Sequence, residues 1–234
     1  MSFGLTVRND DNYVQIDSDN PRLCALYSGA YAATSSTVAT VTFPSPIRTP
    51  EPPCIFIRNS PNQPQVLYRS MTVVGAAGNW TGFRLEAGDN VDSRPAGKWF
   101  AAVFASRSAA SWGLRMWDES GVIIYDSGAV PVLFTKATNS WSFQGWGTWT
   151  DIGSAYYWRS AVTGPIAPDE YFMINPFSRG ILSPNNPNWL PTGARFSYTE
   201  NRLQLFGNGS GPGGITAWSD LGAPAVVFAR LPGT

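Results

Sequence analysis

The chain has 234 residues, and its 16 lysines and arginines are balanced by 16 aspartates and glutamates, so the formal net charge is zero. This balance excludes the basic excess by which nucleic-acid-binding domains are usually recognised, and we expect no nucleic-acid partner. Charged residues make up only 14% of the chain, against about 25% in ordinary soluble domains. Such a surface favours a protein whose faces are covered by partner subunits.

The first predicted strands alternate or are rich in β-branched residues, and turn-forming residues separate them. In the first half of the chain they cover residues 5–8, 13–17, 23–27, 37–43, 54–58, 66–74, 80–86 and 99–104. Residues 44–53 contain five prolines. Because proline cannot complete the hydrogen bonding of a central strand, we expect a loop or linker there.

The second half continues the same pattern. Its predicted strands cover residues 114–118, 122–125, 132–135, 140–143, 155–159, 171–174, 195–198, 202–206 and 225–230. The Pro/Asn-rich segment 183–191 and the Gly-rich segment 207–214 predict exposed loops. No segment longer than ten residues has the apolar spacing of a helix. The chain therefore predicts an all-β fold of the sandwich type with almost no helix.

The sequence of the first predicted hairpin recurs in the second half of the chain. Residues 4–18, GLTVRNDDNYVQIDS, align with residues 113–127, GLRMWDESGVIIYDS, at an offset of 113 − 4 = 109. The identical pairs are Gly4/Gly113, Leu5/Leu114, Asp17/Asp126 and Ser18/Ser127, and the conservative pairs are Val7/Met116, Asn9/Asp118, Asp10/Glu119 and Val14/Ile123. An offset close to half the chain length predicts one β-domain made twice.

Two weaker matches follow in the same order. Residues 55–57 match 172–174 at an offset of 117, and residues 101–105 match 225–229 at an offset of 124. Growing offsets indicate loop insertions in the second copy. We therefore predict two tandem, related β-sandwich-like domains, the first copy over residues 1–106 and the second over 107–234. The sequence leaves open whether they share one core or pack as separate bodies.

The absence of histidine limits the chemistry of the chain. It removes Ser-His-Asp and Cys-His nucleophile activation and every histidine-ligated metal site. Glycosidases can work with two carboxylates alone, but the pairs Asp10-Asp11 and Asp118-Glu119 fall in hairpin turns, where acidic side chains bond their own backbone. We expect no enzyme, no metal and no cofactor.

Two acidic and two sulfur positions carry structural predictions. Asp17 and Asp126 each end the second strand of a hairpin, so we expect their carboxylates to cap the turn that follows. Cys24 and Cys54 are the two cysteines, and their spacing fits no metal motif. We expect buried free thiols, with a disulfide as the alternative if the strands place them side by side.

Aromatic residues are dense in the second half. The candidate binding or interface residues are Trp141, Trp146, Trp149, Tyr156, Tyr157 and Trp158. Glycines around Trp146 and Trp149 predict an exposed loop over residues 144–151. Three interpretations stay open for the cluster: domain core, subunit or partner interface, and a platform on which sugar rings stack.

The repeated hairpin also resembles a known group of proteins. The phrase G-L-x-[VM]-x-[ND]-x-x-[GN]-x-x-x-x-D-S, in residues 4–18 and 113–127, is similar to the opening of tail-tip and tail-fibre-associated minor virion proteins of long-tailed bacteriophages, including those of Pseudomonas. The resemblance covers some thirty residues. It implies a β-rich structural protein without catalytic residues, made in the cytoplasm of the bacterial host and located in the tail of the virion.

The resemblance sets two functional expectations. The first is a non-enzymatic component of the tail tip, baseplate or tail fibre that contributes to assembly and host adsorption. Its partners would be other virion tail proteins, copies of itself, with a trimer as the first expectation, and a host cell-surface receptor or glycan. The alternative is a lectin-like, carbohydrate-binding module that recognises a host surface glycan. No secretory signal opens the chain, and no apolar stretch approaches the ~20 residues that span a bilayer, so we expect no membrane insertion.

Overall fold

The structure is a computed structural model. It describes residues 6–8, 14–17, 22–35, 37–62, 66–88, 94–105, 110–121, 123–149, 153–161, 167–178, 180–183, 186–208, 217–218 and 223–233. For residues 6–8, 14–17, 148–149, 153, 178–191 and 208–218 we describe backbone pairing alone, within those ranges.

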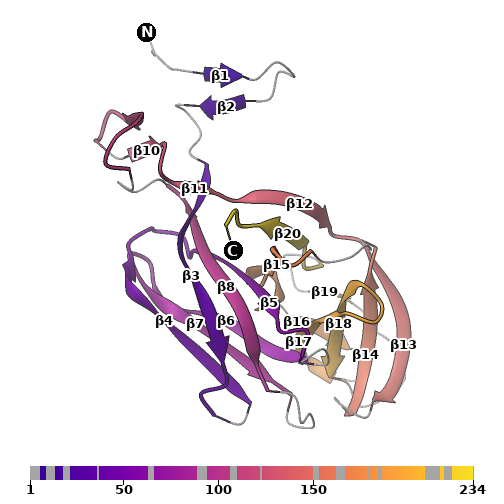
Figure 1. Ribbon diagram of the computed structural model, residues 1–234. Helices are drawn as coiled ribbons and strands as arrows, with labels where there is room; N and C mark the ends of the chain where they lie inside the picture. Colours follow the sequence, from indigo (N-terminus) through magenta and orange to yellow (C-terminus); the bar gives the residue numbers. More distant parts are fainter. Residues whose placement is uncertain are drawn as a thin grey trace.

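Antiparallel strands make up most of the described chain, and most of them belong to two large sheets (Figure 1). The first sheet has the order β11-β3-β8-β5-β15-β20-β12. Its strands are β11 (Val130–Pro131), β3 (Leu23–Ala32), β8 (Ala96–Phe104), β5 (Cys54–Asn59), β15 (Glu170–Met173), β20 (Val226–Arg230) and β12 (Leu133–Thr138). The one short helix in the described ranges is the 3-10 turn η1 (Asn175–Ser178).

The second sheet has the order β13-β14-β18-β17-β6-β7-β4, and two short strands, β16 and β19, join it beside β17. Its strands are β13 (Trp141–Trp149), β14 (Gly153–Ser160), β18 (Arg202–Asn208), β17 (Asn186–Ser197), β6 (Tyr68–Ala76), β7 (Asn79–Ala87), β4 (Val38–Ile47), β16 (Gly180–Ser183) and β19 (Ala217–Trp218). The predicted all-β, sandwich-like fold is confirmed.

Two predicted loops contribute to strands of this second sheet. β4 extends through Pro44 and Pro46, but it is an edge strand, and its pairing with β7 jumps from Thr42–Gly82 to Ile47–Trp80. Prolines are tolerated at an edge with such an irregularity because no neighbouring strand needs their missing N–H. Residues 186–191, inside the predicted loop 183–191, form the start of β17.

The main hydrophobic core lies between the two sheets. The side chains of Phe43, Phe83 and Trp99 pack there with ring centroids 5.2–6.4 Å apart. The hydroxyls of Tyr31 and Tyr68 are buried in the same core and bond each other at 2.6 Å, which satisfies polar atoms that would otherwise be costly to bury. Burial raises the pKa of both tyrosines, so the pair is neutral.

The two halves of the chain share this core. Strand β5 of the first half pairs with β15 of the second, and β6 pairs with β17. The core cluster accordingly mixes side chains from both halves, including Ile55 and Phe172. Residues on both sides of the predicted boundary at 106/107 therefore contribute to one core, and the division into two copies stays a prediction.

The order of strands reveals a pseudo-two-fold relation between the repeats. In the first sheet β3-β8-β5 is followed by β15-β20-β12, and in the second β4-β7-β6 is followed by β17-β18-β14. Along the chain, the strands of each half are thus assigned to the two sheets in the same order. β13 is an additional edge strand in the second half. The central pairing brings equivalent strands together, as in an isologous contact between two subunits.

The register at this centre agrees with the predicted offset of 117. Phe56 lies opposite Met173, its predicted equivalent. On one side of this pair Ile57 lies opposite Phe172, and on the other the N–H of Ile174 donates to the carbonyl of Ile55 over 2.9 Å. The offset of 117 relates Ile57 to Ile174 and Ile55 to Phe172, so it converts one flanking pair into the other. The local two-fold axis therefore passes through the pair of Phe56 and Met173.

The predicted match of residues 101–105 with 225–229 differs by three residues from the equivalence that the strand pairing shows. Ile55 lies opposite Ala101, and Phe172, its equivalent, lies opposite Phe228, so the structural offset is 228 − 101 = 127 and not the predicted 124. Ala101 and Phe228 both face the main core. The two segments are so similar in composition that the sequence does not reveal this difference. The difference matters because a shift by an odd number of residues exchanges the two faces of a strand.

The first sheet closes on itself at one end. Pro131 pairs with β3 while Leu133 pairs with β20, and one residue, Val132, separates them. The two edges of the sheet therefore meet along a nearly continuous segment, β11 and β12.

A smaller hydrophobic cluster, on the side of the first sheet away from the main core, includes Phe56 and Phe100, whose rings stack 4.6 Å apart.

The repeated hairpins form outside the two sheets, at the same end of the molecule (Figure 1). β1 (Thr6–Arg8) pairs with β2 (Val14–Asp17), and β9 (Arg115–Trp117) pairs with β10 (Ile123–Asp126). Every paired position of the second hairpin equals one of the first plus 109, including the irregularity that follows the middle pair. The two hairpins thus share one backbone register at the offset of 109.

Candidate functional site

The predicted aromatic segment lies on paired strands. Residues 144–149, inside the predicted loop 144–151, continue β13 and pair with β14, with Trp146 opposite Tyr156. Residues 150–152 lie outside the described chain. Gly145, at φ +110°, accommodates an irregularity in the pairing, which explains why a glycine-rich stretch that suggested a loop belongs to a strand.

Most of these aromatic side chains belong to the main core. Tyr156 and Trp158 are buried there, and Trp141 and Trp146 are partly buried against the same cluster. The indole N–H of Trp141 donates to the carbonyl of Pro224 over 2.9 Å. The side chain of Trp149 lies outside the described residues. The core interpretation therefore accounts for four of the six candidates.

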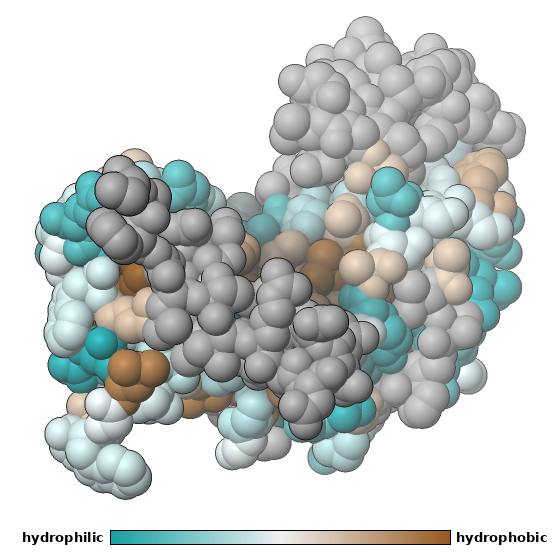
Figure 2. All heavy atoms as spheres, turned by 90° about the horizontal axis from the view of Figure 1, so that it is seen from above, coloured by the Kyte–Doolittle hydropathy of each residue, from teal (hydrophilic) through white to brown (hydrophobic). Residues whose placement is uncertain are grey.

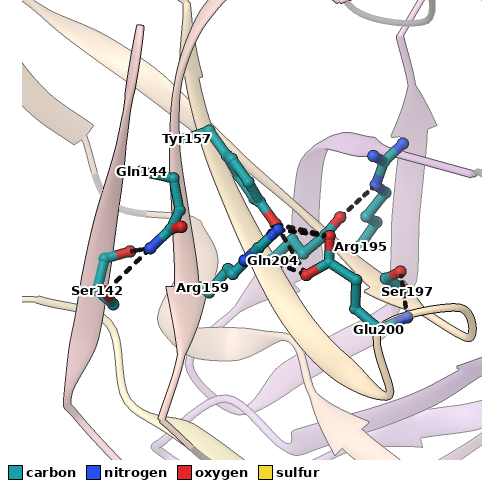
Figure 3. Close-up of polar contacts among 8 residues, drawn as sticks. All are labelled: Ser142, Gln144, Tyr157, Arg159, Arg195, Ser197, Glu200 and Gln204. Atoms are coloured by element: carbon teal, nitrogen blue, oxygen red, sulfur yellow. Dashed lines mark hydrogen bonds and ion pairs between the residues drawn. The ribbon is translucent and has the colours of Figure 1, made fainter.

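Tyr157 points to the opposite face of the sheet, into a polar network (Figure 3). Its hydroxyl accepts from Nε of Arg159 and from Nε2 of Gln204, both over 2.8 Å, and donates to Glu200 over 3.1 Å. Nε of Arg195 in turn donates to Oε1 of Gln204 over 2.7 Å. The phenol thus uses its one donor and both acceptor sites.

This network favours rigidity over catalysis. Burial is the main cause that raises the pKa of Tyr157, so its phenol stays protonated at neutral pH. The Glu200 carboxylate is engaged by Arg159 at 2.8 Å. Acid–base hydrolysis of a glycoside needs a second carboxylate on the far side of the scissile bond, and Glu200 is the one carboxylate among the residues of this network. We interpret the network as a brace across β14, β17 and β18.

The acidic residues of the second hairpin have structural roles. Oδ1 of Asp118 accepts from the N–H of Ser120 over 2.8 Å, as predicted for turn chemistry. Oδ1 of Asp126 accepts from Gly128 over 2.8 Å, and its Oδ2 accepts from Nε of Arg115 over 2.7 Å. The predicted cap is thus confirmed for Asp126. The side chains of Asp10, Asp11 and Asp17, the counterparts in the first hairpin, lie outside the described residues.

The two cysteines are free thiols, as predicted; Cys24 is buried as expected, whereas Cys54 is only half-buried. Cys24 pairs with Val103 and Cys54 with Ala102, on opposite sides of strand β8, so a whole strand separates the sulfur atoms. Burial raises the pKa of the Cys54 thiol, which makes it a weak nucleophile. Among the residues whose side chains are described, no three acidic or cysteine side chains gather closely enough to hold a metal ion.

The second hairpin exposes a group of large apolar side chains that sequence reasoning missed. Trp112, Leu114 and Trp117 are 87%, 45% and 55% exposed. They line a cavity of about 210 Å³ together with Arg115 and Asp126, and the Arg115 guanidinium lies 5.9 Å from the centre of the Trp117 ring. We call Trp112, Leu114 and Trp117 the hairpin anchor. Elsewhere, on the face in Figure 2, hydrophobic residues form small groups among hydrophilic ones.

A sequence signal for this anchor exists two residues upstream of the predicted repeat. Ser2-Phe3-Gly4-Leu5 matches Ser111-Trp112-Gly113-Leu114 at the same offset of 109. Gly113 is retained for a structural reason: its φ is +129°, and a Cβ there would lie 2.1 Å from Oγ of Ser127. No such reason applies to the exposed Trp112.

Comparisons with known proteins add no relative: no family model, curated protein or solved structure matches the chain. Within the described ranges, no helix has the length and apolar character to cross a bilayer. The proposals below therefore depend on the residues and geometry of this chain.

Proposed function

We propose that the chain is a non-enzymatic structural component of a phage tail tip, baseplate or tail fibre, and that it contributes to assembly and host-surface attachment. The observation that carries the proposal is the hairpin anchor. Large aromatic side chains held in the open by a rigid scaffold are the usual centre of a protein–protein contact. The resemblance of residues 4–18 and 113–127 to tail-tip proteins supplies the biological setting.

The scaffold behind the anchor is suited to docking. The buried carboxylate of Asp126 fixes the foot of the hairpin through Gly128 and Arg115, and the N–H of Ser127 donates to the carbonyl of Leu114 over 2.9 Å. A preformed anchor loses little conformational entropy on binding. Truncating a well-buried tryptophan in an interface commonly costs about 2 kcal/mol or more of binding free energy.

The non-enzymatic part of the proposal is supported by the way the described polar groups are used. The Tyr157 hydroxyl uses its donor and both of its acceptor sites within the network. The buried Glu170 carboxylate lies 2.9 Å from the Lys136 ammonium. These groups are committed to structure, and rigid docking by desolvated aromatic side chains needs no covalent step.

One observation favours the alternative of a carbohydrate-binding module. The Trp112 ring is 87% exposed, and a flat, open aromatic face can stack on a sugar ring. The predicted platform of Trp146 and Trp149 is less suitable, because Trp146 packs against the main core. A lectin of this kind would therefore use the hairpin.

The test is to locate the protein in phage particles. Particles produced by the strain that encodes the chain are purified, the chain is sought by mass spectrometry, and immunogold labelling finds its position. We expect labelling at the tail end that contacts the host. Particles that are infectious and lack the chain at every stage of assembly would overturn the proposal.

A further inference from the structure

The two hairpins share one backbone register, and a similar tetrapeptide comes before each of them in the sequence. β1–β2 and β9–β10 share one register, residue for residue, at the offset of 109. The tetrapeptides Ser2-Phe3-Gly4-Leu5 and Ser111-Trp112-Gly113-Leu114 precede or enter them at that offset. The chain therefore carries two copies of one element. The side chains of Phe3 and Leu5 lie outside the described residues, and their equivalence is one of sequence.

The exposed positions of this element have been retained for a reason other than packing. Gly113, Ser127 and Asp126 hold the hairpin foot by contact. Trp112 is 87% exposed and Leu114 is 45% exposed, yet each keeps an apolar counterpart in the first copy. Exposing large apolar side chains to water is unfavourable. Exposed apolar residues in the second copy, with apolar counterparts in the sequence of the first, indicate that both copies are used.

The charge around the motif defines the surface that it fits. Residues 110–128 contain one arginine and three acidic residues, and the equivalent residues 1–19 contain one arginine and four, so the formal charges are 1 − 3 = −2 and 1 − 4 = −3. The rest of the chain compensates, since the total is zero. In the second hairpin Arg115 is already paired with Asp126. A complementary surface is thus an apolar slot with a basic rim.

We propose that the hairpins dock together into two equivalent slots of one symmetric protein assembly, each slot apolar with a rim of lysine or arginine. This inference rests on the proposed function and names its partner by chemistry. Two copies of a docking element on one chain are useful when the partner repeats its binding site, as a closed ring of identical subunits does. Binding through the second hairpin then becomes intramolecular, which raises the affinity about 10²–10⁴-fold over one hairpin alone.

The experiment measures binding of the purified full-length chain to tail particles that lack it, obtained from a phage with the corresponding gene deleted. The variants are W112A/L114A in the second hairpin, F3A/L5A at the equivalent positions of the first, and all four substitutions together. F143A is the matched control, since Phe143 is 48% exposed and lies on β13, an edge strand of the second sheet.

We expect each single-hairpin variant to lose about 10²–10⁴-fold in apparent affinity and the four-fold variant to lose measurable binding, while F143A binds as the wild type. The charge reversals D10K and E119K, at equivalent positions, should each weaken binding, and added salt should weaken the wild type, because exposed charges are screened. Unchanged thermal unfolding in all variants establishes that they fold.

Several results would overturn the inference. If one double variant abolishes binding and the other leaves it unchanged, a single hairpin docks. If all hairpin variants bind as the wild type, the contact lies elsewhere and the proposed tail function stands without this inference. Loss of binding confined to purified host envelope polysaccharide would identify a glycan site, and loss of self-association would identify a second copy as the occupant. A wild-type chain that does not bind the particles would remove the proposed function itself.

Discussion

At the scale of single residues, the second hairpin is held by one buried carboxylate. Asp126 accepts hydrogen bonds from Gly128, Ala110 and Arg115, and its side chain is fully buried. This set joins the segment before the hairpin to the turn after it. The position of the hairpin anchor thus depends on Asp126, which is not itself one of the anchor residues.

Replacing Asp126 by alanine should loosen the hairpin while the sandwich stays folded. The change removes the acceptor of two backbone N–H groups and the carboxylate partner of the Arg115 guanidinium, at about 1.5–3 kcal/mol for hydrogen bonds to a charged group. Hydrogen exchange of amides in β9 and β10 should accelerate by one to two orders of magnitude. Asp118→Ala, in the exposed turn, is the control, and equal acceleration in both variants would contradict the assigned role of Asp126.

Residue identity also explains what the sequence could and could not predict at the candidate site. Asp118 and Asp126 were predictable, because turn and cap bonds connect residues close in sequence. Trp146 was misassigned to a loop, because Gly145 and Gly147 suggested exposure while an irregularity in the strand was the actual use of Gly145. The exposure of Trp112 depends on the absence of neighbours, which no local pattern reports.

At the scale of strands, ion pairs on β6 and β7 reinforce the part of the second sheet beside its edge strand β4. Glu86 on β7 bonds Arg69 on β6, and its Oε2 lies 2.6 Å from Arg84. The hydrogen bond from Arg69 is the first cause that lowers the pKa of Glu86, with a further contribution from Arg84. Both arginine side chains are more than 40% exposed, so solvent screening limits their contribution to about 1 kcal/mol or less.

The pH dependence of this contribution follows from the direction of the shift. Because the pKa of Glu86 is lower in the folded than in the unfolded chain, the stabilisation is complete above the unfolded value of about 4.3 and is lost as the pH falls through the lower, folded value. The free energy of unfolding should therefore differ between wild type and Glu86→Gln near pH 7, and the two should converge near pH 2. A constant difference at both pH values would contradict this.

Strand registers also decide how far the repeat could be followed from sequence. The hairpin and the offset of 117 were predictable, since β5 and β15 keep similar apolar residues at Ile55–Ile57 and Phe172–Ile174. The match between β8 and β20 was displaced by three residues because the matched segments, residues 101–105 and 225–229, consist of Ala, Val and Phe alone. Only the pairing of Ile55 with Ala101 and of Phe172 with Phe228 fixes their register.

At the scale of the whole molecule, the two repeats behave as one body. Equivalent strands meet at Phe56 and Met173, and the main core draws side chains from both halves. The sequence left this arrangement open, because pairing between β5 and β15 joins residues more than 100 positions apart. Long-range pairing of this kind leaves no local signature.

A shared core predicts a single unfolding transition. Replacing Phe56, which is fully buried at the local axis, by alanine should lower the stability by about 3–5 kcal/mol. The transitions followed by fluorescence and by far-ultraviolet circular dichroism should remain coincident. Two separated transitions, one insensitive to the substitution, would show that the halves fold independently.

The most direct test of the proposed docking is an electron-microscopy map of the phage tail at side-chain resolution. The account predicts that Trp112 and Trp117, exposed in the isolated chain, are buried against a neighbouring tail protein, with lysine or arginine beside Glu119. A map in which the chain is present and the Trp112 and Trp117 side chains remain open to solvent would contradict it.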